Sequence, residues 1–192
     1  MKRRTFEGVF KNEFEKYITY KQSLGYYRNL ESKKIYELVS LNNFLNSFNL
    51  SEIKITKNNE QSKCFYQTVF RLLYCTGLRV GEVSNLKVDD VDLENNIVYV
   101  RSGKGNVSRM VPFKSSLGTW LTNYSESYSK ESDTYFFESP RGGKRSPGTI
   151  CAVFRNIILP MAGIKSSPLN GYKRGACVHS LRHSFACNAL NQ

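Results

Sequence analysis

The stretch that most constrains the fold runs from residue 69 to residue 86. An apolar run at residues 69–74 reaches a Thr76-Gly77 break, after which a second apolar pattern begins. In that second pattern the apolar residues share one helical face: Val80, Val83 and Leu86. Gly77 permits a backbone turn that a residue with a side chain would resist. The sequence therefore predicts two helices joined by a tight turn.

Arg79 opens the second of these helices, between two apolar segments. A cation that is buried or half-buried there is costly unless it meets an anion. The anion could be the carboxylate of Glu82, three residues further on, or the phosphate of a ligand. Arg79 alone does not decide between a structural ion pair and a phosphate contact.

The charge balance favours a polyanionic partner. The chain of 192 residues carries a formal net charge of +12, which in a cytoplasmic protein most often indicates nucleic acid. A membrane surface is the competing partner, but no amphipathic helix with a basic polar face stands out. With no membrane-spanning run and no apolar leader after Met1, we expect a cytoplasmic protein. At 40% hydrophobic residues the chain is neither disordered nor fibrous.

The first part of the chain reads as helices followed by a linker. Apolar residues recur at steps of three and four over residues 6–24 and 30–48, which predicts two amphipathic helices. The composition then turns polar before the next apolar segment. We therefore divide the chain into a partial helical segment (1–50), a linker (51–64) and a larger domain (65–192).

The larger domain mixes helices with a small sheet. Strands are expected at 96–101 and 107–112 around a glycine-flanked turn at 102–106, with a turn at 88–92 and a short strand at 135–137. Helices are expected at 65–74, 116–128, 149–159 and 179–190, the third ending at Pro160. Basic loops are expected at 141–148 and 163–177, and for their charge two alternatives stay open: DNA contact or a solvated surface.

The cysteines indicate free thiols. Five cysteines without a C-x-x-C pair argue against disulfides in the cytoplasm. One possible zinc set lies near the C-terminus, comprising Cys177, His179, His183 and Cys187. Three of its members share one helical face, whereas structural zinc sites usually draw ligands from separate elements. We expect no metal.

Three further residues join Arg79 in a set suited to a phosphodiester. Lys104 lies between two glycines at the expected hairpin tip, and His179 and Arg182 lie three residues apart on one helical face. Guanidinium groups bind non-bridging phosphate oxygens in forked geometry, and lysine and histidine can donate protons to bridging oxygens.

These residues also carry a family resemblance. The relevant motifs are Thr76-Gly77-Leu78-Arg79 with Glu82 and Leu86, Gly103-Lys104-Gly105-Asn106 leading to Arg109, and His179-Ser180-Leu181-Arg182-His183. In order and spacing they resemble the tyrosine recombinases of the phage integrase family, over about residues 65 to 192. Each motif alone is weak evidence, and the three together are strong.

The resemblance implies roles for the site residues. Arg79 and Arg182 would hold the scissile phosphate, Lys104 would protonate the leaving 5′ oxygen, and His179 would assist as acid or base. Glu82, His183 and Phe185 would be structural. No metal, nucleotide or other small-molecule cofactor is implied. Expected DNA contacts come from the basic residues Arg101, Arg109, Lys144, Arg145, Lys173 and Arg174.

The sequence departs from the family pattern in two places. All 12 tyrosines precede Arg182, so none stands where the family has its nucleophile. The helical DNA-clamping segment also looks short. We therefore expect a C-terminally truncated, internally deleted copy.

The expected fold class is α+β and mainly helical. It is an incomplete tyrosine-recombinase-like catalytic domain with a small antiparallel sheet, behind a shortened helical arm. The expected function is double-stranded DNA binding without strand cleavage, and other recombinase protomers are implied as further partners. The source would be bacterial or phage-derived, with association to the nucleoid. Residual phosphodiester cleavage and RNA binding by a basic domain are the alternatives.

Overall fold

The computed structural model describes residues 60–101, 107–128, 132–162, 164 and 176–189. The helices expected at 6–24 and 30–48, and most of the expected linker, lie outside these residues. The described elements follow in the order α3 (Glu60–Thr76), α4 (Val80–Asn85), η2 (Val88–Asp90), β1 (Val91–Asp92), β2 (Ile97–Val100), β3 (Arg109–Pro112), α5 (Ser115–Glu126), α6 (Pro147–Val153), η3 (Phe154–Ile158), α7 (Leu159–Met161) and α8 (Val178–Ala189).

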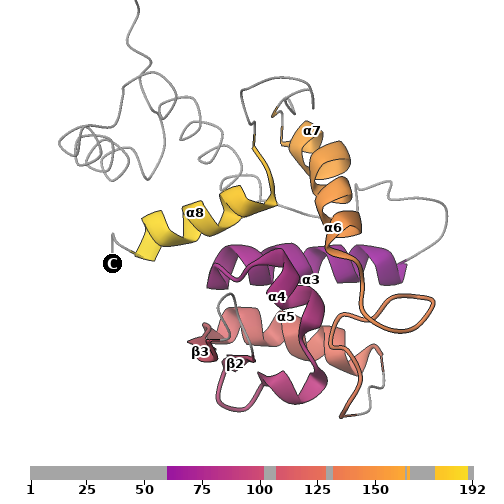
Figure 1. The fold of residues 1–192 in the computed structure, drawn as a ribbon, viewed down its shortest axis with the longest axis vertical. Helices are drawn as coiled ribbons and strands as arrows, with labels where there is room; N and C mark the ends of the chain where they lie inside the picture. The colour runs from indigo at the N-terminus through magenta and orange to yellow at the C-terminus, as the bar shows by residue number, and fades with distance from the viewer. Residues whose placement is uncertain (1–59, 102–106, 129–131, 163, 165–175, 190–192) are drawn as a thin grey trace, which may run out of the picture.

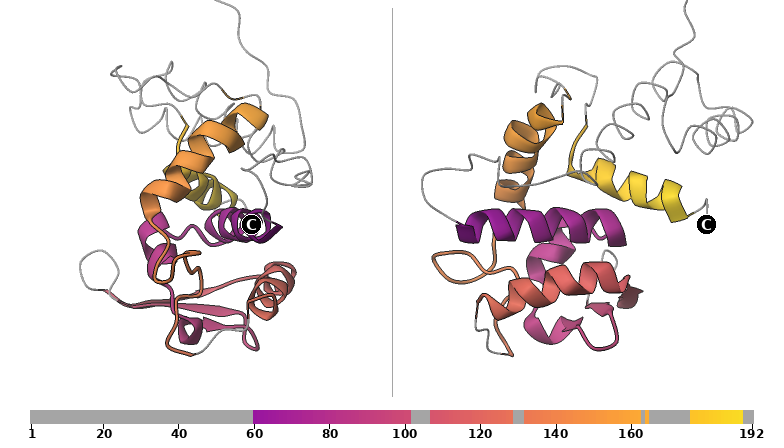
Figure 2. Two further views of the ribbon diagram at one scale, coloured as in Figure 1. Left: turned by 90° about the vertical axis from the view of Figure 1, so that its right-hand side faces the viewer. Right: turned by 180° about the vertical axis from the view of Figure 1, so that it is seen from behind.

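Helix α3 is the centre of the fold. Phe65, Val69 and Leu72 are among its fully buried side chains. α5 and the sheet lie on one side of it, and α6, α7 and α8 lie on the other (Figures 1 and 2). The helix begins at Glu60, not near residue 65 as the apolar pattern predicted. Polar residues can form the first turn of a helix because helix formation there needs no buried side chain.

The sheet is small and antiparallel, as the sequence predicts. β2 lies between β1 and β3, and Val98 is paired with Val91 on one side and Val111 on the other. Val98 and Val100 are buried while Ile97 and Tyr99 are less so, which is the alternation of a strand with one covered face. The segment expected as a turn at 88–92 forms the 3₁₀ turn η2 followed by β1.

The strand expected at residues 135–137 does not form. This segment has only isolated bridges, Lys87 to Tyr135 and Glu138 to Lys144. Phe136 and Phe137 are both buried, and the ring centroid of Phe137 lies 5.6 Å from that of Phe65. Aromatic residues favour strands largely because strands offer half-buried surfaces, and here a turn inside an aromatic cluster buries them instead.

The helical segment that begins at Pro147 continues beyond its expected end. Ser146 caps it by accepting a hydrogen bond from the Gly148 N–H, and α6, η3 and α7 then follow without a break to Met161. The expected stop at Pro160 was therefore wrong. η3 is a π-helical turn in which the Leu159 N–H donates to the carbonyl of Phe154. Proline clashes with the carbonyl four residues before it in a regular helix, and a widened turn relieves this clash.

Helix α8 brings the end of the described chain back to α3. Its Leu181 is fully buried and Ser184 nearly so. α8 and α3 pack against each other although a hundred residues of sequence separate them (Figure 2). None of the described helices combines the length and apolar character needed to cross a membrane.

Candidate phosphate-binding site

The turn between α3 and α4 forms as the glycine predicts. Gly77 has a φ of +62°, in the left-handed region, and its N–H donates to the carbonyl of Leu73 at 3.1 Å. The Thr76 hydroxyl donates to the carbonyl of Leu72 at 2.5 Å and accepts from the Leu78 N–H at 3.4 Å. These bonds satisfy backbone groups at the end of α3. The chain then enters α4 with Arg79 at its N-cap.

Arg79 and Glu82 form the ion pair that the sequence allowed. Arg79 Nη1 lies 2.9 Å from Glu82 Oε1, and the Arg79 backbone N–H donates to Glu82 Oε2 at 2.8 Å. Only 7% of the Glu82 side chain is exposed, compared with 39% for Arg79. Arg79 can therefore keep its structural partner and still present part of its guanidinium to a ligand.

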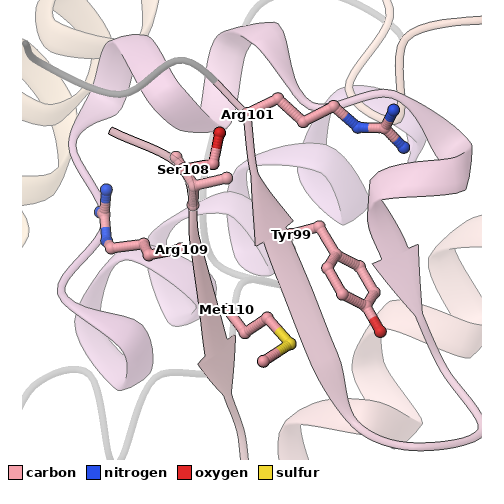
Figure 3. Close-up of a pocket in the computed structure, with 6 residues that line it drawn as sticks. Tyr99, Arg101, Ser108, Arg109 and Met110 are labelled. Carbon is pink, nitrogen blue, oxygen red and sulfur yellow. The ribbon is translucent and has the colours of Figure 1, made fainter. Parts of the chain in front are cut away.

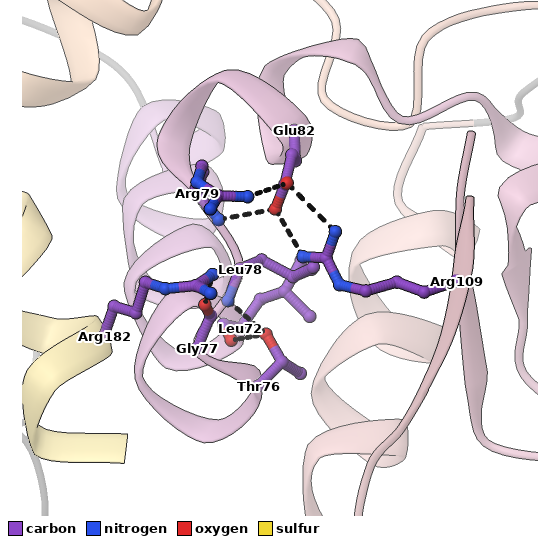
Figure 4. A network of polar contacts seen from close by, with 8 residues as sticks. All are labelled: Leu72, Thr76, Gly77, Leu78, Arg79, Glu82, Arg109 and Arg182. Atoms are coloured by element: carbon purple, nitrogen blue, oxygen red, sulfur yellow. Dashed lines mark hydrogen bonds and ion pairs between the residues drawn. The ribbon is translucent and has the colours of Figure 1, made fainter. Parts of the chain in front are cut away.

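Arg109 completes this network from the sheet. Its Nη1 and Nη2 donate to Glu82 Oε1 and Oε2 at 3.1 and 2.7 Å, a forked arrangement (Figure 4). Burial by itself raises the pKa of Glu82, but hydrogen bonds from Arg109 and Arg79 outweigh it and lower the pKa to about 2. Glu82 is therefore ionised under all ordinary conditions.

Arg182 reaches the same turn from α8. Its Nη1 donates to the carbonyl of Gly77 at 2.6 Å. Figure 4 shows Arg182 extending from α8 to Gly77, while Arg79, at the start of α4, is directed to Glu82. The structure thus brings together the two arginines that the sequence motifs singled out. The ion pair and the backbone bond hold both guanidiniums in place before any ligand binds.

His179 is exposed on the first turn of α8. Its ring centroid lies 4.8 Å from that of His183, with the two rings nearly perpendicular. The Cys177 N–H donates to the Ser180 hydroxyl at 3.1 Å, which caps the start of the helix. Lys104, Lys173 and Arg174 lie outside the described residues, so their expected roles stay predictions.

Arg101 lies at the end of β2 and pairs with a buried carboxylate. Its Nε is 2.5 Å from Asp90 Oδ1, and Asp90 Oδ2 accepts from the Lys87 N–H at 2.9 Å. Arg101 and Arg109 border a shallow pocket of about 430 Å³ and leave it in opposite directions (Figure 3). The other residues that line the pocket are Tyr99, Val100, Ser108 and Met110.

Lys144 and Arg145 occupy different environments although they are adjacent. Lys144 is exposed, and its Nζ donates to Asn85 Oδ1 at 3.2 Å. The Arg145 guanidinium instead stacks over the Phe65 ring, 4.0 Å from its centroid. The Arg145 carbonyl accepts a hydrogen bond from the Ser84 hydroxyl. This loop is therefore anchored to α3 and α4, and the Arg145 side chain is directed toward the core.

Sequence reasoning did not identify two carboxylate contacts. It named Arg109 and Arg101 as DNA contacts without assigning their partners Glu82 and Asp90. The sequence offers only the positions of the two arginines as a signal. Arg101 lies just before the hairpin segment 102–106, and Arg109 lies shortly after it. Among the described residues no group of three or more potential metal ligands forms, and the side chain of Cys187 lies outside them.

Comparison with known sequences shows what the chain is similar to. Residues 43–192 match the sequence profile of the Phage integrase family. The tyrosine recombinase XerA of Pyrococcus furiosus is 38% identical over 123 residues, which cover 63% of this chain and 39% of the relative. A probable integrase/recombinase protein of Methanocaldococcus jannaschii is 34% identical over 140 residues, covering 72% and 42%. The chain thus spans about two fifths of the length of these curated relatives.

Solved structures show the same similarity in three dimensions. A crystal structure of XerA recombinase aligns with a TM-score of 0.56 and 28% identity, covering 80% of this chain and 47% of the other. XerH recombinase bound to its difH substrate in a pre-cleavage complex aligns with a TM-score of 0.58 and 25% identity, covering 79% and 41%.

Proposed function

Because this chain belongs to the Phage integrase family, whose profile matches residues 43–192, we propose that it binds duplex DNA and holds a backbone phosphate between Arg79 and Arg182. The observation that carries the proposal is that Arg182 of α8 bonds to the Gly77 carbonyl, two residues before Arg79 at the start of α4. A charged donor fixed in advance by protein contacts needs little reorganisation when an anion arrives.

The net charge of +12 supports a polyanionic ligand, and the exposed Lys144 would extend the contact along the backbone. Arg145 is a weaker candidate for a DNA contact because its guanidinium lies over the Phe65 ring. Arg101 and Arg109 are also weaker candidates for DNA contacts. Each is paired with a carboxylate, which compensates part of its positive charge.

We propose the remaining chemistry from the family resemblance. Lys104 would donate a proton to the leaving 5′ oxygen, and His179, exposed on α8, would act as acid or base. For the described residues the proposal covers DNA binding and stabilisation of phosphate charge. Contacts with other recombinase protomers on the same DNA are part of the proposal.

Salt-dependent binding tests the proposal directly. Affinity for duplex DNA should fall steeply as salt rises, and Arg79→Gln and Arg182→Gln should each weaken binding about tenfold and reduce the salt slope by about one. Arg155→Gln removes the same charge from η3, outside the proposed site, and is the control. An affinity for duplex DNA that does not change with salt concentration would refute the proposal, and so would equal losses of affinity in all three variants.

RNA is the competing ligand. Matched duplexes of DNA and RNA, and a single strand of each, should be compared under the same salt. A preference for RNA, or for either single strand, would favour a basic RNA-binding domain instead.

A further inference from the structure

The strongest unassigned feature is the position of Arg109 on the far side of Glu82 from Arg79. We propose that Arg109 is a positioning residue for Arg79, acting through the Glu82 carboxylate instead of touching DNA. The inference rests on the proposed function only in taking Arg79 as the phosphate contact.

The hydrogen bonds divide evenly over the carboxylate. Glu82 Oε1 accepts from Arg79 Nη1 at 2.9 Å and from Arg109 Nη1 at 3.1 Å. Glu82 Oε2 accepts from the Arg79 backbone N–H at 2.8 Å and from Arg109 Nη2 at 2.7 Å. A planar fork on two oxygens fixes the plane of the carboxylate, which a single donor cannot do. The direction in which Arg79 is held therefore depends on Arg109.

The charges give a second reason. A buried carboxylate paired with Arg79 alone would cancel most of the positive charge offered to a phosphate. With Arg109 the three side chains carry a net charge of +1, and the Glu82 side chain is only 7% exposed. Arg109 thus compensates Glu82 and leaves the Arg79 charge available to an anion.

The position of Arg109 in the chain adds a mechanical link. It is the first residue of β3 and pairs across the sheet with Val100 of β2. Its bonds to Glu82 tie the base of the expected hairpin to the start of α4. In the sequence, Lys104 lies in the segment between these two strands.

The first test follows Arg79 and Glu82 without DNA. In nuclear magnetic resonance spectra of the full chain, Arg109→Lys should broaden or average the side-chain N–H signals of Arg79. It should also raise the pKa of the Glu82 carboxyl. Lysine keeps the charge but cannot form the fork. Arg155→Lys makes the same change in η3 and should leave the Arg79 signals and the pKa of Glu82 unchanged. Unchanged Arg79 signals in Arg109→Lys, with a preserved amide spectrum, would overturn the proposal.

The second test measures affinity for duplex DNA. If Arg109 acts through Glu82, Arg109→Lys should weaken binding about tenfold although no charge is lost, and should add little to Arg79→Gln. If Arg109 touches a phosphate itself, Arg109→Lys should stay within about twofold of the unaltered chain, and the losses of Arg109→Gln and Arg79→Gln should add. The second pattern would overturn the proposal.

A folding defect and a failure of the proposed function can both be recognised. Where Arg109→Lys loses its native amide spectrum, Arg109→Gln replaces it, because it also removes the fork on Glu82 and leaves the direct bonds between Arg79 and Glu82 intact. Should the unaltered chain bind no DNA, the proposed function fails, and the Arg79 signals still decide whether Arg109 positions that side chain.

Discussion

The ring of Phe185 on α8 lies directly against Gly77 in the turn between α3 and α4. A Cβ atom placed on Gly77 would lie closer to Phe185 Cδ1 than real contacts allow. Next to this contact, Arg182 of the same helix donates to the Gly77 carbonyl. The absence of a side chain at one position thus sets how α8 docks and where Arg182 points.

Gly77→Ala should therefore be costly for two reasons. The φ of +62° disfavours any residue with a Cβ, and the new methyl group would push against Phe185. We expect unfolding free energy to fall by about 1–3 kcal/mol from backbone strain, with a further loss from the contact. Urea denaturation measures it. Gly81→Ala is the matched control, since nothing lies within 4 Å of its Cβ position, and it should be neutral or stabilising.

The parts of the fold set by local pattern were predictable. Periodicity and turn chemistry between residues close in sequence predict four features: the Gly77 turn, α4, the β2–β3 pairing and α8. The aromatic run at residues 135–137 and the passage of the helix through Pro160 were not predictable in the same way. Both depend on tertiary context, the first on burial next to Phe65 and the second on the π turn η3.

The site shows the same division. Arg79 and Arg182 could be named from motifs, and Arg182 bonds to the carbonyl of Gly77, two residues before Arg79. The partners of Arg109 and Arg145 could not be named, because a basic residue in a strand or loop looks alike whether it meets Glu82, the Phe65 ring or solvent. Only packing separates these environments.

Glu82 should make stability depend on acid pH. Its pKa is about 2 in the folded chain and 4.5 in the reference state, so its ion pairs stabilise the fold above the reference pKa. That contribution, about 3 kcal/mol, is lost as pH falls from about 5 toward 2. The difference in unfolding free energy between the unaltered chain and Glu82→Gln should therefore shrink over this range. A difference that stays constant down to pH 2 would contradict the network.

Leu181→Ala should loosen α8 more than the rest of the chain. Leu181 is fully buried where α8 packs on α3. Removing a buried leucine side chain typically costs about 2–5 kcal/mol. Amide hydrogen exchange should accelerate first in residues of α8, with α3 and α5 protected until global unfolding. Equal acceleration in α5 would mean that α8 is not a separable unit of the fold.

Arg145→Lys should destabilise the fold, whereas its neighbour Lys144 should tolerate substitution. The Arg145 guanidinium lies 4.0 Å from the Phe65 ring centroid, and its Nε is buried without a hydrogen-bond partner among the described residues. A lysine ammonium cannot spread its charge over the ring in the same way and resists desolvation more strongly. Urea denaturation should show a loss of about 1–2 kcal/mol in unfolding free energy.

Lys144→Gln should change the unfolding free energy by no more than about 0.5 kcal/mol, as exposed substitutions usually do. It should weaken duplex binding and reduce the salt slope of binding by about one. The two adjacent basic residues would then have different roles: Arg145 supports the fold and Lys144 contacts DNA. If Arg145→Lys instead left stability unchanged and reduced only DNA affinity, the stacking on Phe65 would have no energetic role.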